Sequence, residues 1–203
     1  MPENKAYTLV AYMRKTDADT SAPLYPTERH NEVAGCKSER AKQEKYLVWK
    51  LLEKVVTNDL KLDFANIKFT KNDNGKWVCP DFHFSLSHAD ALVCVAVSKD
   101  EVGVDAEPLR EINAGLKARI LTDAEITYMQ GLPASEQNRF LLESWVKKES
   151  IFKKSGGKML LPNRLTASEH NTELAYVELD GCEYVISVAT DHSEIEFKHM
   201  EEI

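Results

Sequence analysis

The chain has 203 residues, of which 43% are hydrophobic and 29% charged, and these proportions exclude collagen-like, coiled-coil and low-complexity disordered sequences. Its longest uninterrupted apolar run covers seven residues, Ala91 to Val97, and its N-terminus lacks the apolar core of a signal peptide, so we expect a cytoplasmic protein without a membrane partner. The formal net charge of −7 argues against general binding of nucleic acid.

The first half of the chain combines strand-forming stretches with one long amphipathic pattern. Residues 28–56 place apolar side chains at helical spacing, and Asn72-Asp73-Asn74-Gly75 is a typical hairpin turn. We expect, in chain order, a strand over 7–13, a helix over 28–56, hairpin strands over 67–70 and 76–78, a loop leading through Phe82–His88, and strands over 91–98 and 102–107.

The second half contains two helical patterns followed by two strands. Residues 114–130 and 136–155 look helical, and Gly156-Gly157 marks the end of the second helix. Strands follow near 174–179 and 183–190. The last strand, YVISVAT, resembles the earlier strand LVCVAVS, which hints at two similar α+β lobes. Two ordinary buried strands explain the same likeness equally well.

Basic residues are concentrated in two segments of this acidic chain. The segment 37–54 has six basic and three acidic residues, and the segment 147–158 has five Lys and one Glu. Such local clusters suit a small polyphosphate ligand better than a nucleic-acid duplex, although solvated helix faces produce the same pattern. The four cysteines include no Cys-x-x-Cys pair, so we expect reduced thiols and no zinc site.

Two carboxylates lie two residues apart in the strand pattern G-V-D-A-E. Alternate side chains of a strand share a face, so Val104 and Ala106 would face the core while Asp105 and Glu107 would point together to the other side. Gly103 would leave space beside them. Paired carboxylates repel each other unless water or a cation separates them, and oxygen ligands of this kind suit Mg²⁺. An exposed strand end with two solvated acids is the alternative.

The helix at 136–155 presents Trp145, Glu149 and Lys153 at intervals of four residues, and therefore on one face. A glutamate flanked by lysines can be a further metal ligand or a base among phosphate-binding cations. A surface pair between Glu149 and Lys153 is the alternative and would stabilise the helix by only about 0.2–0.5 kcal/mol.

The stretch Phe84-Ser85-Leu86-Ser87-His88 places hydroxyls and an imidazole before the buried strand. These groups can form hydrogen bonds with a phosphate. A serine hydrolase is the competing interpretation, but the chain contains no G-x-S-x-G motif.

The order and spacing of F-S-L-S-H, G-V-D-A-E and W-V-K-K-E-S-I-F-K-K-S-G resemble those of the 4'-phosphopantetheinyl transferases, in particular the two-lobed surfactin-synthetase-activating (Sfp) type. The likeness is strongest over residues 75–160. The resemblance implies an α+β pseudodimer of two similar lobes, 1–100 and 101–203, with the active site between them. It also implies a monomer.

Members of that family transfer 4'-phosphopantetheine from coenzyme A (CoA) to a serine of an acyl or peptidyl carrier protein, and release adenosine 3',5'-bisphosphate. The resemblance implies that Asp105, Glu107 and Glu149 bind Mg²⁺, with Mn²⁺ also possible. It further implies that Glu149 takes the serine proton, directly or through water, and that Lys153 stabilises the pyrophosphate. Exposed apolar positions of 114–130 are the expected carrier-binding surface.

The resemblance implies a further set of CoA-binding residues in the first half of the chain. His88 would bind a CoA phosphate, the 3'-phosphate in many relatives, with Ser87 nearby. Gly75 and Lys76 would line the adenine and phosphate pocket. The remaining candidates for the phosphates are Arg40 and, after it, Lys37.

The sequence departs from the family pattern at three places, one of which is an N-terminal third with few of the usual Arg/Lys clusters, so we expect modest CoA affinity. Ala89-Asp90 follows the Ser-His pair, so a negative charge stands near the expected phosphate site, and Gly156-Gly157-Lys158-Met159 replaces the usual G-K-G-L order. Two other functions therefore remain open. One is a non-catalytic protein of the same fold that binds CoA or a nucleotide, and the other is a metal-dependent hydrolase of phosphate esters.

Overall fold

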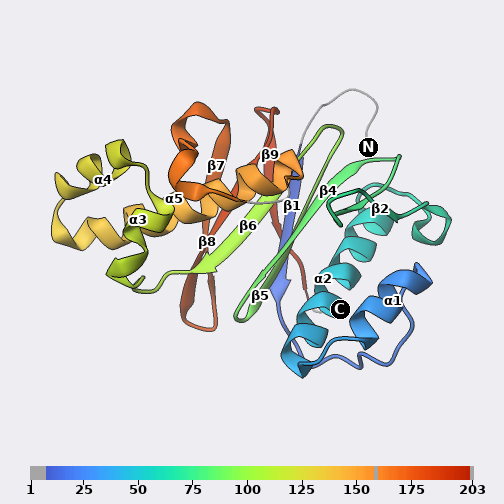
Figure 1. Ribbon diagram of the computed structural model, residues 1–203. Helices are drawn as coiled ribbons and strands as arrows, with labels where there is room; N and C mark the ends of the chain where they lie inside the picture. The colour runs from blue at the N-terminus through green and yellow to red at the C-terminus, as the bar shows by residue number, and fades with distance from the viewer. Residues whose placement is uncertain (1–7, 158–159, 202–203) are drawn as a thin grey trace.

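The computed structural model describes residues 8–157 and 160–201 and combines helices with sheets, as expected for an α+β protein (Figure 1). One sheet has the strand order β4-β5-β1-β9, a second has the order β6-β8-β7, and β2 pairs with β3 in a small hairpin. The strands are β1 (Thr8–Arg14), β2 (Thr70–Lys71), β3 (Trp77–Val78), β4 (His83–Ala89), β5 (Leu92–Ser98), β6 (Gly103–Pro108), β7 (Thr172–Leu179), β8 (Cys182–Ala189) and β9 (Ile195–His199).

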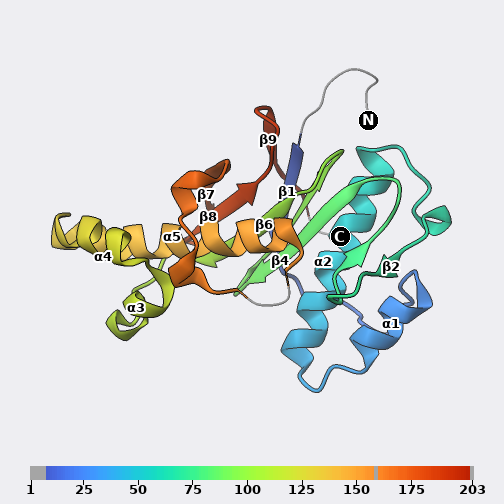
Figure 2. The same cartoon turned by 45° about the horizontal axis from the view of Figure 1, so that its top comes forward.

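Two long helices pack against these sheets, α2 against the first and α5 against the second (Figures 1 and 2). The helices are α1 (Thr27–Ala34), α2 (Glu39–Asn58), α3 (Lys117–Ile120), α4 (Asp123–Gln130) and α5 (Ala134–Ser155). Short 3-10 turns occur at Phe64–Asn66, Ala114–Leu116, Pro162–Arg164 and Ala167–Glu169.

An aromatic cluster fastens α2 and the β2–β3 hairpin to the first sheet. Trp49 of α2 is fully buried, and its ring lies 5.1 Å from that of Phe69 and 5.4 Å from that of Trp77. Phe84 of β4 adds an edge-on contact with Trp49, at 6.1 Å. Because each aromatic side chain buries roughly 150–250 Å² of surface, this cluster fixes the hairpin where its turn can reach α5.

The sequence predicted one helix over 28–56, and the structure corrects this to two helices. Helix α1 ends at Gly35, whose N–H donates to Asn31 O at 2.9 Å. Ser38 then begins α2, since its hydroxyl accepts a hydrogen bond from Ala41 N. A serine cap of this kind satisfies a backbone N–H that the start of a helix leaves unpaired. The apolar spacing continued across the break and concealed it.

Gly103 allows α5 to lie directly on β6. A Cβ atom at this position would stand 1.9 Å from Ser150 O and 2.4 Å from Lys154 N, so a larger residue would push the helix away. Ser150 Oγ also lies 2.9 Å from Ser187 Oγ of β8. The predicted space beside Gly103 is therefore filled by the backbone of α5, which brings its side chains over β6.

Three other elements differ from expectation. The F-S-L-S-H stretch lies on β4 and pairs antiparallel with β5, whereas a loop was predicted. The helical pattern over 114–130 divides at Thr122, which forms a capping box with Glu125 and so starts α4. Strand β9 was not predicted, because charged residues interrupt its short apolar pattern.

Strand β9 links the two halves of the chain. It comes from the second half but pairs in parallel with β1, so it belongs to the first sheet. The structure thus places one segment of 101–203 beside 1–100, and the similarity of two lobes stays a prediction. Lys158 and Met159, part of the altered motif after α5, lie outside the described residues.

Cys36, Cys79, Cys94 and Cys182 are all free, as expected, and Cys94 is buried. Among the residues described, no helix is long and apolar enough to cross a membrane.

Candidate active site

The candidate site lies where the two sheets meet, between β4 and β6. Ser85 of β4 accepts a hydrogen bond from Val104 N at 3.0 Å, and Ser87 donates one to Asp105 Oδ1 at 2.9 Å. Helix α5 lies across β6, with its C-terminal end near β4 (Figure 2). Residues from three elements far apart in the sequence therefore converge at one place.

The carboxylates of β6 face α5, as the alternation predicted. Val104 and Ala106 are 0% and 2% exposed in the core, whereas Asp105 and Glu107 point to the other side. We call Asp105, Glu107 and Glu149 the acidic cluster.

Helix α5 places its predicted face over the acidic cluster. Lys153 Nζ donates to Asp105 Oδ1 at 2.7 Å and to Ser87 Oγ at 3.0 Å. Trp145 Nε1 lies 3.2 Å from Glu107 Oε1 and donates to it. Lys153 pairs with Asp105 and not with Glu149, so the alternative of a surface pair between Glu149 and Lys153 is wrong.

Burial and repulsion by neighbouring carboxylates raise the pKa of two members of this cluster, Glu107 and Glu149. Burial, followed by the charges of Asp105 and Glu107, raises the pKa of Glu149, while Lys153 acts in the opposite direction. Burial and the charge of Asp105 likewise raise the pKa of Glu107 against the effect of Trp145. Among the described residues, Asp105 Oδ2 is buried without a hydrogen-bond partner. The cluster therefore has more negative charge than its neighbours neutralise.

The donor atoms of the acidic cluster fit a hard divalent cation. Within 8–157 and 160–201, no three His, Cys, Asp or Glu side chains are already arranged around a common metal position. Lys153 and Trp145 each occupy one carboxylate oxygen of the cluster. The unpartnered Oδ2 of Asp105, the oxygen-only donor set and the repulsion among the carboxylates all match what Mg²⁺ requires.

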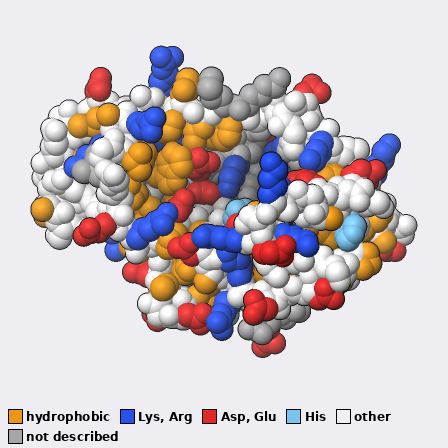
Figure 3. All heavy atoms as spheres, turned by 60° about the horizontal axis from the view of Figure 1, so that its bottom comes forward, with side chains coloured by type: hydrophobic (Ala, Val, Ile, Leu, Met, Phe, Trp, Pro, Cys, Tyr) orange, Lys and Arg blue, Asp and Glu red, His pale blue; other side chains and the backbone are white. Residues whose placement is uncertain are grey.

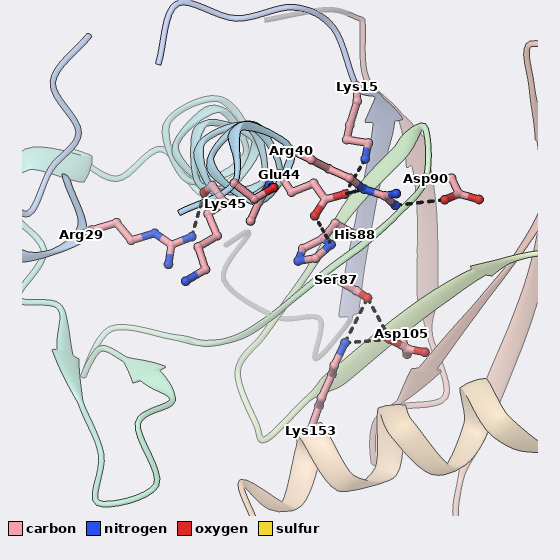
Figure 4. A network of polar contacts seen from close by, with 12 residues as sticks. Lys15, Arg29, Arg40, Glu44, Lys45, Ser87, His88, Asp90, Asp105 and Lys153 are labelled. Carbon is pink, nitrogen blue, oxygen red and sulfur yellow. Dashed lines mark hydrogen bonds and ion pairs between the residues drawn. The ribbon is translucent and has the colours of Figure 1, made fainter. Parts of the chain in front are cut away.

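A second group of polar residues lies beyond Ser87, on the other face of β4 (Figure 4). We call Lys15, Arg40 and His88 the basic cluster. All three contact Glu44 of α2: Lys15 Nζ at 2.8 Å, Arg40 Nε at 2.9 Å and His88 Nδ1 at 3.4 Å. Figure 3 shows the hollow in the surface around the acidic and basic side chains.

The surroundings of His88 favour its uncharged form. Burial lowers its pKa, and the positive charges of Lys153 and Lys15 lower it further, against the effect of Glu44 and Asp105. The imidazole can still donate one hydrogen bond and accept another. His88 feels the charge of Lys153, beside the acidic cluster, as well as that of Lys15, in the basic cluster. The two clusters are therefore neighbours.

Asp90, the departure from the family pattern, makes a defined contact. It occupies the β4–β5 turn with φ +40° and accepts a hydrogen bond from Arg40 Nη2 at 3.1 Å. Its negative charge is thus directed at Arg40. Arg40 itself remains 68% exposed, so it can reach a ligand.

The remaining predicted residues, Gly75, Lys76 and Lys37, belong to neither cluster. Gly75 and Lys76 line a pocket of about 240 Å³ together with Lys153, but Lys76 Nζ donates to Lys153 O at 2.7 Å. Burial lowers the pKa of Lys76. Lys37 is exposed before α2 and has no hydrogen bond or ion pair to any described residue. Lys76 therefore supports the end of α5, and nothing in the structure draws Lys37 into the site.

Sequence reasoning missed two members of the site, Lys15 and Glu44. Lys15 directly follows β1, and Glu44 lies on the buried side of a helix that is otherwise apolar there. A buried glutamate in an amphipathic helix was a signal, since charged residues are rarely buried without a partner.

A larger pocket, of about 800 Å³, adjoins the acidic cluster and shares Glu107 and Trp145 with it. Its rim includes the exposed apolar residues Leu116 and Leu161. The complete lining is Glu107, Arg110, Glu111, Ile112, Asn113, Leu116, Arg119, Ile120, Leu142, Trp145, Leu160, Leu161, Pro162 and Asn163.

Comparison with known proteins finds the family that the sequence motifs resemble. Residues 101–198, which contain the acidic cluster and Lys153, match the 4'-phosphopantetheinyl transferase superfamily. About half of the chain is similar to the 4'-phosphopantetheinyl transferases. It is 34% identical over 113 residues to gsp of Aneurinibacillus migulanus and 31% identical over 115 residues to ffp of Bacillus subtilis, both named 4'-phosphopantetheinyl transferases.

A third 4'-phosphopantetheinyl transferase, Sfp of Bacillus subtilis (strain 168), is 28% identical over 115 residues. Each of the three alignments covers 55% of this chain, and they cover 48% of gsp and 51% each of ffp and Sfp. The matched segment thus spans about half the length of these relatives. The resemblance to the Sfp type is confirmed, while the residues before 101 lie outside the family match.

Proposed function

We propose that the protein transfers 4'-phosphopantetheine from CoA to a serine of an apo acyl or peptidyl carrier protein and releases adenosine 3',5'-bisphosphate. The supporting observation is the acidic cluster on β6 and α5, with Lys153 at one end. An excess of buried negative charge beside a lysine suits a polyphosphate substrate that arrives with a divalent cation.

The transfer needs one bond to form and one to break. The carrier serine Oγ attacks the phosphorus that bears the pantetheine arm, and the bond from this phosphorus to the bridging oxygen breaks. Adenosine 3',5'-bisphosphate leaves with the bridging electron pair. We assign Glu149 to accept the serine proton, directly or through a water, because burial and its neighbours raise its pKa and make it a better base.

Asp105, Glu107 and Glu149 would hold Mg²⁺, with Mn²⁺ as an alternative. When bound, such a cation neutralises the charge of the pyrophosphate. Lys153 adds a second positive charge, and it lies where Asp105 and Ser87 hold its amino group. Exchange of Lys153 from Asp105 to the pyrophosphate would free Asp105 for the cation.

CoA carries negative charge at two places, the pyrophosphate and the 3'-phosphate. The two clusters on either side of β4 match this distribution: Ser87 and Lys153 lie on one side, and Arg40 and His88 on the other. Gly75 lines the small pocket beside Lys153, where a base can pack.

The large pocket beside Glu107 is our candidate for the carrier-binding surface. The pocket presents the exposed apolar residues Leu116 and Leu161 among charged residues of both signs, two arginines and two glutamates. An apolar centre with a polar rim is typical of protein interfaces. We further propose that the protein acts as a monomer in the cytoplasm.

The test is an intact-protein mass spectrum of an apo carrier after incubation with the protein, CoA and Mg²⁺. Parallel samples contain EDTA or lack the protein. We expect the carrier to gain the mass of one phosphopantetheine only with protein, CoA and Mg²⁺ together. Carriers from fatty-acid and peptide synthesis should be tested side by side.

Two results would replace this proposal. CoA binding without a mass gain on any carrier would favour a non-catalytic protein that binds CoA. Breakdown of CoA in the absence of a carrier would favour a metal-dependent hydrolase.

A further inference from the structure

Glu44 occupies the centre of the basic cluster. Its Oε1 accepts hydrogen bonds from Lys15 Nζ and Arg40 Nε, and its Oε2 lies 3.4 Å from His88 Nδ1 (Figure 4). These groups come from the end of β1, from α2 and from β4. One internal carboxylate thus holds the positive and polar groups that three elements bring together.

The carboxylate of Glu44 is ionised and fixed in place. Its side chain is only 9% exposed. Burial alone would raise its pKa, but the hydrogen bonds from Lys15 and Arg40 outweigh burial and lower it. Asp90 adds a second negative charge at Arg40. The two negative charges, Glu44 and Asp90, thus equal in number the two permanent positive charges, Lys15 and Arg40.

Space for a ligand lies beside the cluster. A pocket of about 420 Å³ is lined by Arg14, Lys15, Thr16, Asp17, Arg40, Gln43 and Leu47. This volume is typical of a site for a small ligand. A phosphate in this pocket would reach Lys15 and Arg40, the same groups that Glu44 already binds.

We propose that Glu44 is a specificity-determining residue that competes with the 3'-phosphate of CoA for Lys15, Arg40 and His88. The protein therefore discriminates only weakly between CoA and 3'-dephospho-CoA. This inference rests on the proposed function, because it takes CoA as the ligand. A phosphate that enters the pocket must displace Glu44 from its partners or accept the repulsion of its charge, and either effect weakens binding.

The test measures binding of CoA and of 3'-dephospho-CoA by isothermal titration, with Mg²⁺ and without a carrier protein. The variants are Glu44→Gln, which keeps the shape but removes the charge, and Glu39→Gln. Glu39 is a matched control because it lies on the same helix and its side chain is 81% exposed. Glu39→Gln removes one negative charge, as Glu44→Gln does, but at a position outside the basic cluster.

For the wild type, we expect the dissociation constants of the two ligands to agree within about threefold. Glu44→Gln should tighten CoA binding roughly tenfold and change binding of 3'-dephospho-CoA less than about twofold, because only CoA places a dianion at the cluster. Glu39→Gln should change both constants by less than about twofold.

Three results would overturn the inference. Weaker CoA binding by Glu44→Gln would make Glu44 a support for the cations, and equal tightening of both ligands would place a different phosphate at the cluster. A wild-type preference for CoA above about thirtyfold would also contradict it, even if Glu44→Gln fails to fold. In each case CoA binding and carrier modification by the wild type would continue, and the proposed function would stand. Absence of binding of either ligand by the wild type would remove both proposals.

Discussion

Two glutamates of this molecule, Glu32 and Glu149, have pKa values shifted in opposite directions. Glu32 of α1 faces α2 and the β2–β3 hairpin, and it accepts contacts from Trp77 Nε1 at 2.9 Å and Lys71 Nζ at 3.0 Å. Lys45 and Arg29 add two further contacts. Burial raises its pKa, but these donors outweigh burial and bring the pKa to about 2.

The acidic cluster has far fewer donors for its charge. The structure gives Glu149 no hydrogen bond among the described residues, and its pKa is raised. Glu32 thus stabilises the fold, whereas the acidic cluster concentrates charge that the fold alone does not neutralise. Under the proposed function, this contrast separates a structural carboxylate from a functional one, because enzymes often place destabilising charge where a substrate or cation binds.

Replacement of Asp105 should have the largest effect on activity. We expect Asp105→Ala to lower phosphopantetheine transfer by more than about a thousandfold, because it removes a proposed metal ligand and the partner of Lys153. The protein should stay folded, since the fall in repulsion within the cluster offsets part of the loss of the Asp105 contacts with Lys153 and Ser87. Transfer rates and thermal melting measure both effects. Near-normal transfer by Asp105→Ala would exclude the assigned metal site.

Glu149→Gln separates proton transfer from ligand binding. We expect CoA binding within about threefold of the wild type and a transfer rate lower by about a hundredfold or more, because the amide cannot take the serine proton. Isothermal titration and single-turnover transfer give the two values. A large loss of CoA binding with an unchanged maximal rate would instead make Glu149 a ligand only.

Lys148 provides a comparison on the same helix as Glu149. Its side chain is fully buried, and its Nζ donates to Ile120 O at 2.9 Å, to Pro162 O at 3.0 Å and to Glu125. We expect Lys148→Met to lower the free energy of unfolding by about 3 kcal/mol, since it leaves these acceptors without a partner. Denaturant unfolding measures this change. A loss below about 1 kcal/mol would show that the contacts of Lys148 contribute little.

Glu32→Gln tests the other side of the comparison. We expect a loss of about 2 kcal/mol of stability at pH 7 with little change in transfer at 25 °C. A carboxylate with a lowered pKa stabilises the fold above its unfolded pKa, near 4.5, and loses this effect as the pH falls toward about 2. The difference between wild type and variant should therefore be constant above pH 4.5 and shrink below it. A difference that grows toward acid pH would contradict the assignment.

The sequence predicted the acidic cluster well because strand alternation and helix spacing are local rules. Asp105 and Glu107 needed only a period of two, and Trp145, Glu149 and Lys153 only a period near four. The sequence predicted free space beside Gly103, but only the structure shows that α5 fills this space.

The basic cluster was predicted less completely, because its members come from three elements with no common spacing. Lys15 and Glu44 carried no motif, and Lys76, predicted to line the adenine and phosphate pocket, donates a hydrogen bond to Lys153 O. The break between α1 and α2 depended on one capping hydrogen bond at Ser38, and β9 depended on pairing with β1 from the far end of the chain. Interactions over such distances leave little trace in a local pattern.

We propose that the acidic cluster carries uncompensated charge, which a divalent cation neutralises when CoA is bound. The most direct measurement is the melting temperature of wild type and Asp105→Ala with CoA, each with and without Mg²⁺. Our account predicts that Mg²⁺ raises the melting temperature of the CoA-bound wild type and leaves that of CoA-bound Asp105→Ala unchanged. An equal rise in both proteins, or none in the wild type, would contradict it.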